Sequence, residues 1–493
     1  MQKVKFKMKK KIIFTASALL STVIVVIYLA VTDGKTNNIP DSLEKFVPKF
    51  VKNFILNDVF IVKNLKNKIK KHKKSLVSIG LENREGQKIN DILLDELYEL
   101  GLKNLEFVEV RNEDLLSNKS NSFNLTTFET YHLSAGTWPH TRASAYFERH
   151  KDKIILVSKN AIFSYFDIDS LKNDKLNSKI IQNNIREIVK NDNLYKHGGQ
   201  GIKDILIDQD KIYVSYSNVD EKECTNTGIL VADLNLKFLN FDKFFIPPTC
   251  IVKRNGHNRW SYNSAGGRLV SYDDNTFLFS HGGFKTRTAA QDDVTVFGKN
   301  ILIDKNTKVW SIFSKGHRNV QGLYYNKEEN YVLSTEHGPM GGDEINLNII
   351  KDNEVKNFGW PVASYGEHYG GRTKENDINY KEAPLKKSHK EHGFVEPIMY
   401  FAPSIGITAI EKVPNSFHKN YKNDFFVAAM GKHIEEGDLS LHHIKINKDT
   451  NEVSFHEIIP INERIRDIMY VKELNKFILW LENSASLGLI GAN

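Results

Sequence analysis

The feature that most constrains the fold is a strand–turn–strand unit that recurs along the chain. In each unit, two short apolar runs flank four or five turn residues rich in Asp, Asn, Lys and Glu. The units occupy residues 145–165, 202–218, 267–283, 320–338, 407–429 and 465–483. Repeated antiparallel units without helical crossovers favour a β-propeller, because radial repetition leaves few exposed sheet edges. The sequence therefore predicts an all-β, six-bladed β-propeller. A β-sandwich, which needs fewer and more closely spaced strands, is the lesser alternative.

The N-terminal region has a different character. Residues 12–31 form an uncharged apolar run, long enough to cross a bilayer as a helix, that follows six lysines and precedes Asp33. This pattern predicts a cytoplasmic basic tail and transmembrane anchor over residues 1–31. The rest of the chain would then lie outside the cytoplasm, periplasmic or at the cell surface. A cleaved signal peptide is the alternative, but the run is long for one and lacks a clear cleavage site.

The segment between the anchor and the first hairpin carries apolar residues at helical spacing, interrupted by a lysine run. We expect a small membrane-proximal helical spacer over residues 32–130, followed by the propeller over residues 131–493. The net charge of +8 is concentrated in the N-terminal lysines and in this run. Since charge is nearly balanced elsewhere, a nucleic-acid partner is not indicated.

The chain has two cysteines, Cys224 and Cys250. In an oxidising compartment an isolated pair usually forms a disulfide, so we expect a bridge here if the propeller is exported. Two reduced buried thiols are the alternative.

Several loops beside the hairpins carry polar side chains suited to an anionic ligand. Arg318 and Asn319 precede the fourth hairpin, Arg464 and Arg466 lie at the start of the sixth, and Gln200 precedes the second. A propeller brings such loops to one mouth, and guanidinium groups bind carboxylates in a bidentate fashion while staying charged. The arginines therefore predict an anion site.

The segment TEHGPMGGDEINL, residues 335–347, suits a hard cation. Ca²⁺ collects backbone carbonyls and carboxylates, and a glycine-rich loop can turn its carbonyls inward while Glu344 supplies charge. An anionic cofactor bridged to a calcium ion would explain this loop and the arginines together.

The motifs GHRNVQG, TEHGPMGGDEINL, NFGWP and RIRD occur in this order, and with them the chain resembles the soluble glucose dehydrogenase and aldose sugar dehydrogenase family. The resemblance covers roughly residue 138 to the C-terminus. It implies a six-bladed propeller that uses pyrroloquinoline quinone (PQQ) and Ca²⁺ to oxidise a sugar.

Carried over position by position, the resemblance also implies ligand roles. Arg318, Asn319 and Gln200 would contact the quinone, and Arg464 and Arg466 would hold its carboxylates. The Gly338 and Pro339 carbonyls would bind the calcium ion that bridges to PQQ. Glu344 and the Phe358 carbonyl would belong to a second, structural calcium site.

The chain departs from the family at the reacting side of the site. The family's general base is a histidine, and the matching position here is Ser264, which is far too weakly basic without an activating partner. His257 is one candidate substitute, and His433 is another. The family's quinone-contacting lysine aligns with Gly431, one residue before Lys432.

Three functions remain open at this point. The first is a membrane-anchored, PQQ- and calcium-dependent dehydrogenase that acts on an aldose or related hydroxyl compound, with an altered base and an external electron acceptor. The second is a catalytically silent, calcium-stabilised propeller that binds a sugar, a quinone or a protein. The third is a calcium-dependent hydrolase or lactonase, because a propeller does not fix the chemistry.

Overall fold

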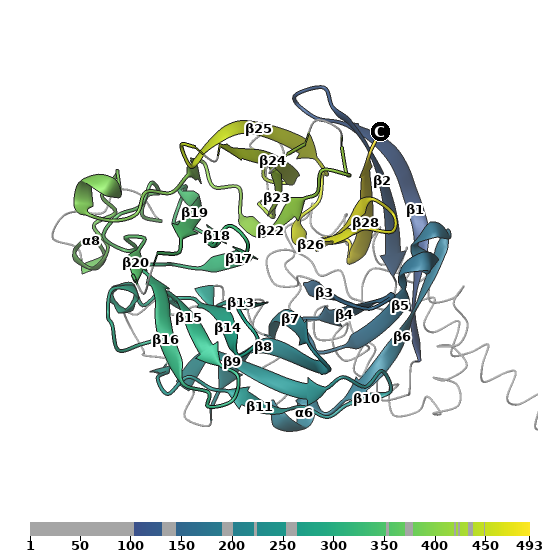
Figure 1. Ribbon diagram of the computed structural model, residues 1–493, viewed down its shortest axis with the longest axis horizontal. Helices are drawn as coiled ribbons and strands as arrows, with labels where there is room; N and C mark the ends of the chain where they lie inside the picture. Colours follow the sequence, from purple (N-terminus) through teal and green to yellow (C-terminus); the bar gives the residue numbers. More distant parts are fainter. Residues whose placement is uncertain are drawn as a thin grey trace, which may run out of the picture. The chain divides into compact units, whose positions relative to one another are not determined.

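The computed structural model describes residues 103–130, 144–189, 201–220, 224–252, 264–351, 354–369, 378–418, 421–422, 424–431, 437–447 and 449–493. Lys103–Asn493 forms one compact unit, distinct from Met1–Leu102. Its described strands assemble into six four-stranded antiparallel blades around a central axis (Figure 1). The predicted all-β, six-bladed propeller is confirmed.

The first three blades follow the chain in order. Blade 1 contains β3 (Ala145–His150), β4 (Lys153–Ser158), β5 (Phe163–Asp167) and β6 (Lys175–Asn183). Blade 2 contains β7 (Ile202–Asp208), β8 (Lys211–Val219), β9 (Cys224–Asp233) and β11 (Asp242–Phe245). Blade 3 contains β13 (Gly266–Ser271), β14 (Thr276–His281), β15 (Lys299–Asp304) and β16 (Trp310–Lys315).

The next two blades repeat the pattern. Blade 4 contains β17 (Val320–Asn326), β18 (Tyr331–Glu336), β19 (Asp343–Ile349) and β21 (Met399–Phe401). Blade 5 contains β22 (Ile407–Val413), β23 (Asp424–Ala429), β24 (Ser440–Asn447) and β25 (Glu452–Pro460). Each of the six predicted hairpins supplies the inner two strands of one blade.

Short elements complete the blades. The extra strands β10 (Phe238–Leu239), β12 (Ile251–Val252) and β20 (Lys356–Asn357) pair with β6, β9 and β16 respectively. The described helices are the α-helices α6 (Ile185–Ile188) and α8 (Ile378–Glu382) and the 3-10 helices η1 (Ile168–Lys172), η3 (Thr288–Ala290) and η4 (Lys390–His392).

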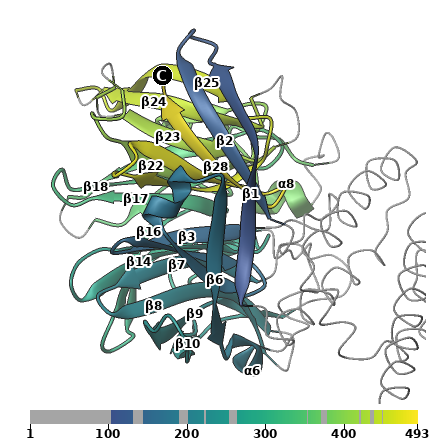
Figure 2. The same ribbon diagram turned by 90° about the vertical axis from the view of Figure 1, so that its right-hand side faces the viewer.

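Blade 6 is built from both ends of the propeller sequence. Its inner strands are β26 (Ile465–Val471), β27 (Lys476–Leu481) and β28 (Ser486–Ala492), and its outer strand is β2 (Ser122–Thr130). Strand β1 (Asn104–Leu116) pairs with β2 and also with β6, so it joins blade 6 to blade 1 (Figure 2). The predicted end of the helical spacer at residue 130 is therefore wrong. Residues 104–130 form strands because the exposed edges of β28 and β6 offer them backbone partners.

The ring is closed by contacts between neighbouring inner strands. β3, β7, β13, β17, β22 and β26 each contact the next in the series, and β26 contacts β3. Apolar side chains of adjacent blades interdigitate between them, for example Ile155 and Val157 of blade 1 with Ile212 and Val214 of blade 2. Second strands such as IILV in β4 are apolar on both faces for this reason.

Two predictions about the chain can be compared with this structure. Cys224 and Cys250 form a disulfide, as expected. Among the described residues, no helix has the length and apolar character needed to cross a bilayer. The predicted anchor at residues 12–31 and the first part of the spacer, residues 32–102, lie outside the described part of the chain.

Candidate active site

The candidate site lies at the end of the propeller where the inner strands begin and the second strands end, which we call the mouth. Five inner strands share a register shift near their first residues: β7, β13, β17, β22 and β26. A bulge re-aims one side chain without disturbing the rest of a strand. In β26 the shift falls at Arg466, and in β17 it falls at Gln321; these two side chains meet across the ring, with Nη1 of Arg466 donating to Oε1 of Gln321 at 3.2 Å.

The two arginines of the RIRD motif share one buried carboxylate, Glu482. Nε and Nη2 of Arg464 each lie 3.0 Å from Oε2 of Glu482. Nε and Nη2 of Arg466 donate to Oε1 at 3.0 and 2.7 Å, and the Ser144 hydroxyl donates to the same oxygen. Nη1 of Arg464 donates to the Gly431 carbonyl at 3.0 Å. The pair therefore keeps one net positive charge at the mouth.

Arg318 brings a further positive charge from the junction between blades 3 and 4. Its Nη1 donates to the His337 carbonyl at 2.8 Å, and its guanidinium lies 5.5 Å from the Trp360 ring centroid. Its amide donates to Oε1 of Glu336, which ends strand β18. These contacts fix the backbone at Arg318 and leave most of its guanidinium N–H groups for other partners.

Asn319 is buried and has a structural task. Its Oδ1 accepts hydrogen bonds from the Gly266 amide at 3.1 Å and from Nε2 of Gln321 at 3.0 Å. The side chain thus ties the start of β17 to the start of β13. The contact with Gly266 brings Asn319 to the segment that carries Ser264, two residues before Gly266.

Ser264 lies at the mouth with its backbone fixed. It is buried, and its carbonyl accepts the Phe284 amide at 2.9 Å. Among the described residues, no histidine or carboxylate is hydrogen-bonded to its hydroxyl. A serine without such a partner is a poor base. The candidate substitute bases His257 and His433, together with Gln200 and Lys432, lie outside the described residues.

The loop that follows β18 is held in a defined shape. The Gly338 amide donates to Oδ1 of Asp343 at 3.0 Å, and Oδ2 of Asp343 accepts the Ile407 amide at 3.0 Å. Burial raises the pKa of Asp343 to about 6 despite these amide donors. The Asp343 carboxylate therefore links blades 4 and 5 by hydrogen bonds.

Glycines are required in this loop by close approach and by backbone conformation. A Cβ on Gly338 would lie 2.0 Å from the Gly342 carbonyl oxygen. Gly341 and Gly342 have φ values of 79° and 70°, which disfavour other residues. No hydrogen bond among the described residues ends on the Gly338 carbonyl, and the Pro339 carbonyl accepts only the Ser404 hydroxyl at 3.4 Å. Two carbonyls held in this way suit a hard cation.

The other carboxylate, Glu344, belongs to a buried polar network behind the loop. Its Oε1 lies 3.3 Å from Nε2 of His389, and its Oε2 accepts Nδ2 of Asn346 at 3.3 Å. Nδ1 of His389 donates to the Phe358 carbonyl at 2.8 Å. Burial lowers the pKa of His389, but the contacts with Glu344 outweigh burial and raise it overall. The structure thus brings together Glu344 and Phe358, which the sequence singled out, through a histidine that it did not.

Two of the residues that sequence reasoning missed are Glu482 and His389. Glu482 directly follows the apolar run of β27, as Glu336 closes that of β18, and a carboxylate at the end of a buried strand is a usable signal. No pattern singles out His389, which lies 45 residues along the chain from Glu344 in an irregular segment.

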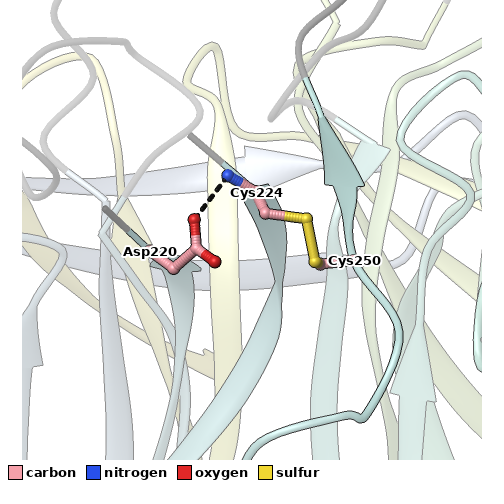
Figure 3. A group of neighbouring side chains, drawn as sticks. All are labelled: Asp220, Cys224 and Cys250. Carbon is pink, nitrogen blue, oxygen red and sulfur yellow. Dashed lines mark hydrogen bonds between the residues drawn. A yellow bond between two sulfur atoms is a disulfide. The ribbon is translucent and has the colours of Figure 1, made fainter. Parts of the chain in front are cut away.

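A third group of polar atoms, Asp220, Cys224 and Cys250, is not a metal centre. Their potential ligand atoms lie close together, but the two sulfur atoms are joined in the disulfide (Figure 3). The Asp220 carboxylate accepts the Cys224 amide at 2.8 Å. The group therefore fixes the start of β9.

Comparisons with known proteins agree with the fold and with the motifs. The family model for glucose/sorbosone dehydrogenase matches residues 171–487. The aldose sugar dehydrogenase YliI of Escherichia coli (strain K12) is 26% identical over 317 residues, which cover 60% of this chain and 78% of that protein. The uncharacterized protein slr1608 of Synechocystis sp. is 26% identical over 245 residues, 45% of this chain and about half (54%) of that protein.

A solved structure supports the fold. The soluble aldose sugar dehydrogenase of Escherichia coli in its apo form superimposes with a TM-score of 0.56 at 20% identity, covering 72% of this chain and 97% of that one. Because the family model spans well over half of the residues, its match decides the assignment. The chain belongs to the glucose/sorbosone dehydrogenase family.

Proposed function

We propose that this protein is a PQQ- and calcium-dependent oxidoreductase that acts on an aldose or a related hydroxyl compound. The family membership supports a sugar-oxidising activity, and the aldose sugar dehydrogenase relative has this activity in its name. The mouth supplies groups that would hold an anionic cofactor and a cation. The third possibility, a hydrolase or lactonase, has no set of converging carboxylates around one cation among the described residues.

The observation that carries the proposal is the arginine cluster at the mouth. A guanidinium has five N–H donors, and Arg464 and Arg466 each use about three on Glu482 and on neighbouring oxygens. The remaining donors, with those of Arg318, make no hydrogen bond to a second carboxylate among the described residues, although Glu463 acts electrostatically on Arg464 and Asp343 on Arg318. Several guanidinium groups with unused donors at one mouth favour a multiply anionic ligand such as PQQ.

The loop carbonyls suit the calcium ion that this cofactor would need. Gly338 and Pro339 would bind it through backbone oxygen, with the cofactor supplying further oxygen ligands. The hydrogen bonds of Asp343 would keep the backbone of Gly338 and Pro339 in place. When bound, PQQ with calcium supplies the acceptor for a hydride from the substrate carbon.

The chain's own residues would hold and orient the cofactor, but the proton of the substrate hydroxyl needs a base. Ser264 occupies the position of the family's histidine and has no activating partner in the described structure. This observation favours the second candidate function, a propeller that binds PQQ or a sugar without turning it over. The two candidates share the cofactor site and differ only at the base.

Calorimetry of PQQ binding to the purified full-length chain in detergent tests the cofactor site. We expect tight binding with calcium and at least a tenfold loss with chelator. The variant Arg464→Gln, Arg466→Gln, Glu482→Gln removes the arginine charges without stranding Glu482, and Glu473→Gln, at an exposed ion pair, is its control. Binding lost in the triple variant but kept in the control supports the proposal, whereas equal binding in both would assign the arginines a purely structural role.

The proposal extends to location. The lysine block and the apolar run at residues 12–31 support a membrane anchor with the propeller outside the cytoplasm, where a disulfide is stable. Protease added to intact cells should degrade the propeller while alkaline washing leaves the chain in the membrane. Full protection from protease would reverse the assigned orientation.

A further inference from the structure

The imidazole of His389 lies between the two oxygens that the family resemblance assigns to a second calcium ion. Nδ1 contacts the Phe358 carbonyl at 2.8 Å, and Nε2 contacts Oε1 of Glu344 at 3.3 Å. The side chains of His389 and Glu344 are 1% and 6% exposed. Both contacts are therefore inside the protein.

The position of this ring is fixed by its surroundings. His389 precedes η4, and its carbonyl accepts the amides of His392 and Phe394 at 3.0 Å. Its ring stacks on Tyr365 with centroids 5.6 Å apart and an interplanar angle of 14°. Glu396 accepts the amide of Lys390 at 2.8 Å and the hydroxyl of Tyr365. The segment thus holds the imidazole with one ring nitrogen toward the Phe358 carbonyl and the other toward Oε1 of Glu344.

A calcium ion cannot contact both oxygens while the ring is there. Ca²⁺ binds oxygen at about 2.3–2.6 Å, so two of its ligands are at most about 5 Å apart. The imidazole ring stands between Phe358 O and Glu344 Oε1, 2.8 Å from the first and 3.3 Å from the second. It therefore fills the space that an ion bound by both oxygens would occupy.

The imidazole also lies beside a network of buried carboxylates, although its Nε2 is only in charge contact with Glu344 and makes no hydrogen bond in the described structure. Asn346 donates to Oε2 of Glu344 at 3.3 Å and, more weakly, to Oε2 of Glu336 at 3.5 Å. Oε2 of Glu336 accepts Nδ1 of His317 at 2.7 Å, and the His317 ring stacks on Phe358 at 4.8 Å. The two buried carboxylates thus each have an imidazole partner, on either side of Asn346.

We propose that the side chain of His389 takes the place of the second calcium ion, so that this chain binds calcium only at the Gly338–Pro339 loop. Only the calcium ion at the Gly338–Pro339 loop rests on the proposed function. The replacement of the second calcium ion by His389 rests on the contacts of His389 given above. Its consequence is that the packing of blade 4 does not depend on calcium.

Counting calcium ions in the full-length protein tests this directly. Calorimetric titration of the calcium-free wild type and of Glu344→Gln should give the same stoichiometry, at most one ion per chain. A second ion in the wild type that is lost in Glu344→Gln would overturn the proposal. A stoichiometry of zero in both would refute the loop calcium of the proposed function and leave the role of His389 supported.

A gain-of-binding variant provides the complementary test. His389→Gly opens the space of the ring between Phe358 O and Glu344, so we expect one additional calcium ion per chain and a melting temperature that rises with calcium. The additional ion should vanish in the double variant His389→Gly, Glu344→Gln. His456→Gly removes another half-buried imidazole, one that has no carboxylate partner in the described structure, and should gain no calcium.

One alternative occupant is a small transition-metal ion bound jointly by His389 and Glu344, since adjacent ligands of such an ion also lie about 3.3 Å apart. Metal analysis of the purified protein distinguishes it. Stoichiometric zinc that is lost in both His389→Gly and Glu344→Gln would overturn the proposal, and its absence supports it.

Discussion

Replacing Glu482 by glutamine should destabilise the propeller strongly. The Glu482 side chain is fully buried and receives two contacts from each of two arginines at 2.7–3.0 Å. Glutamine keeps the shape but removes the charge and presents an NH₂ group where two guanidinium groups donate. Two buried cations then lack a counter-ion, and breaking a buried ion pair costs about 3–5 kcal/mol.

Glu473→Gln is the matched control. Glu473 pairs with Arg149 at 2.6 Å, but both side chains are about 40% exposed (43% and 37%). Exposed pairs contribute about 0–1 kcal/mol, so this variant should resemble the wild type. The two changes are chemically identical and differ in burial.

Urea unfolding followed by tryptophan fluorescence measures both effects. We expect a large drop in the urea midpoint for Glu482→Gln and almost none for Glu473→Gln. If the two variants unfold at the same midpoint, Glu482 does not balance the arginines and the charge count at the mouth is wrong. A second readout follows from the same count: the surviving Glu482→Gln protein should bind anions more tightly, because the mouth gains one unit of positive charge.

Three further predictions concern a buried histidine of blade 5, the strands that close the propeller ring, and the general base of the proposed reaction. His443 lies between Asp424 and Glu457; burial lowers its pKa, but the hydrogen bonds to both carboxylates outweigh burial and raise it, while the pKa of Glu457 falls to about 2. The stabilisation that His443 contributes is therefore complete below pH about 6.5 and is lost as the pH rises through its raised folded pKa. The difference in unfolding free energy between wild type and His443→Gln should accordingly shrink above that pH in urea titrations. A chain that begins at residue 103 should be monomeric in gel filtration, whereas one that begins at residue 131 should aggregate, because it lacks β1 and β2 and exposes the edge of β28. Ser264→His should raise PQQ-dependent sugar oxidation in a dye-reduction assay and Ser264→Ala should not; no gain would mean that more than the base differs from the family.

Local sequence patterns predicted the inner parts of the blades well. In each hairpin the two strands are neighbours in sequence, so alternation and turn residues are sufficient to define them. The arginine and glycine motifs were also readable, because their residues lie within a few positions of each other. The anion and cation sites that they suggest were therefore predictable from short segments.

The closing strands were not predicted, for a physical reason. The segment NLEFVEVRNEDLL has apolar residues that fit either a helix face or an alternating strand. The choice is made by backbone partners more than 60 residues away in β6 and more than 350 away in β28, by way of β2. The partners of the site residues depend on the fold in the same way: Glu482 and His389 acquire their roles only when distant blades and loops meet.

The sequence by itself thus predicted the repeat, the number of blades and the disulfide, and it fixed the positions of the arginines and the glycine loop along the chain. Each of these follows from short-range pattern and from covalent neighbours. Only the tertiary structure decided which charges are neutralised. Glu482 balances the arginine pair, and the His389 imidazole separates Glu344 from the Phe358 carbonyl, because electrostatics and coordination depend on distances of a few ångströms between atoms that the sequence keeps far apart.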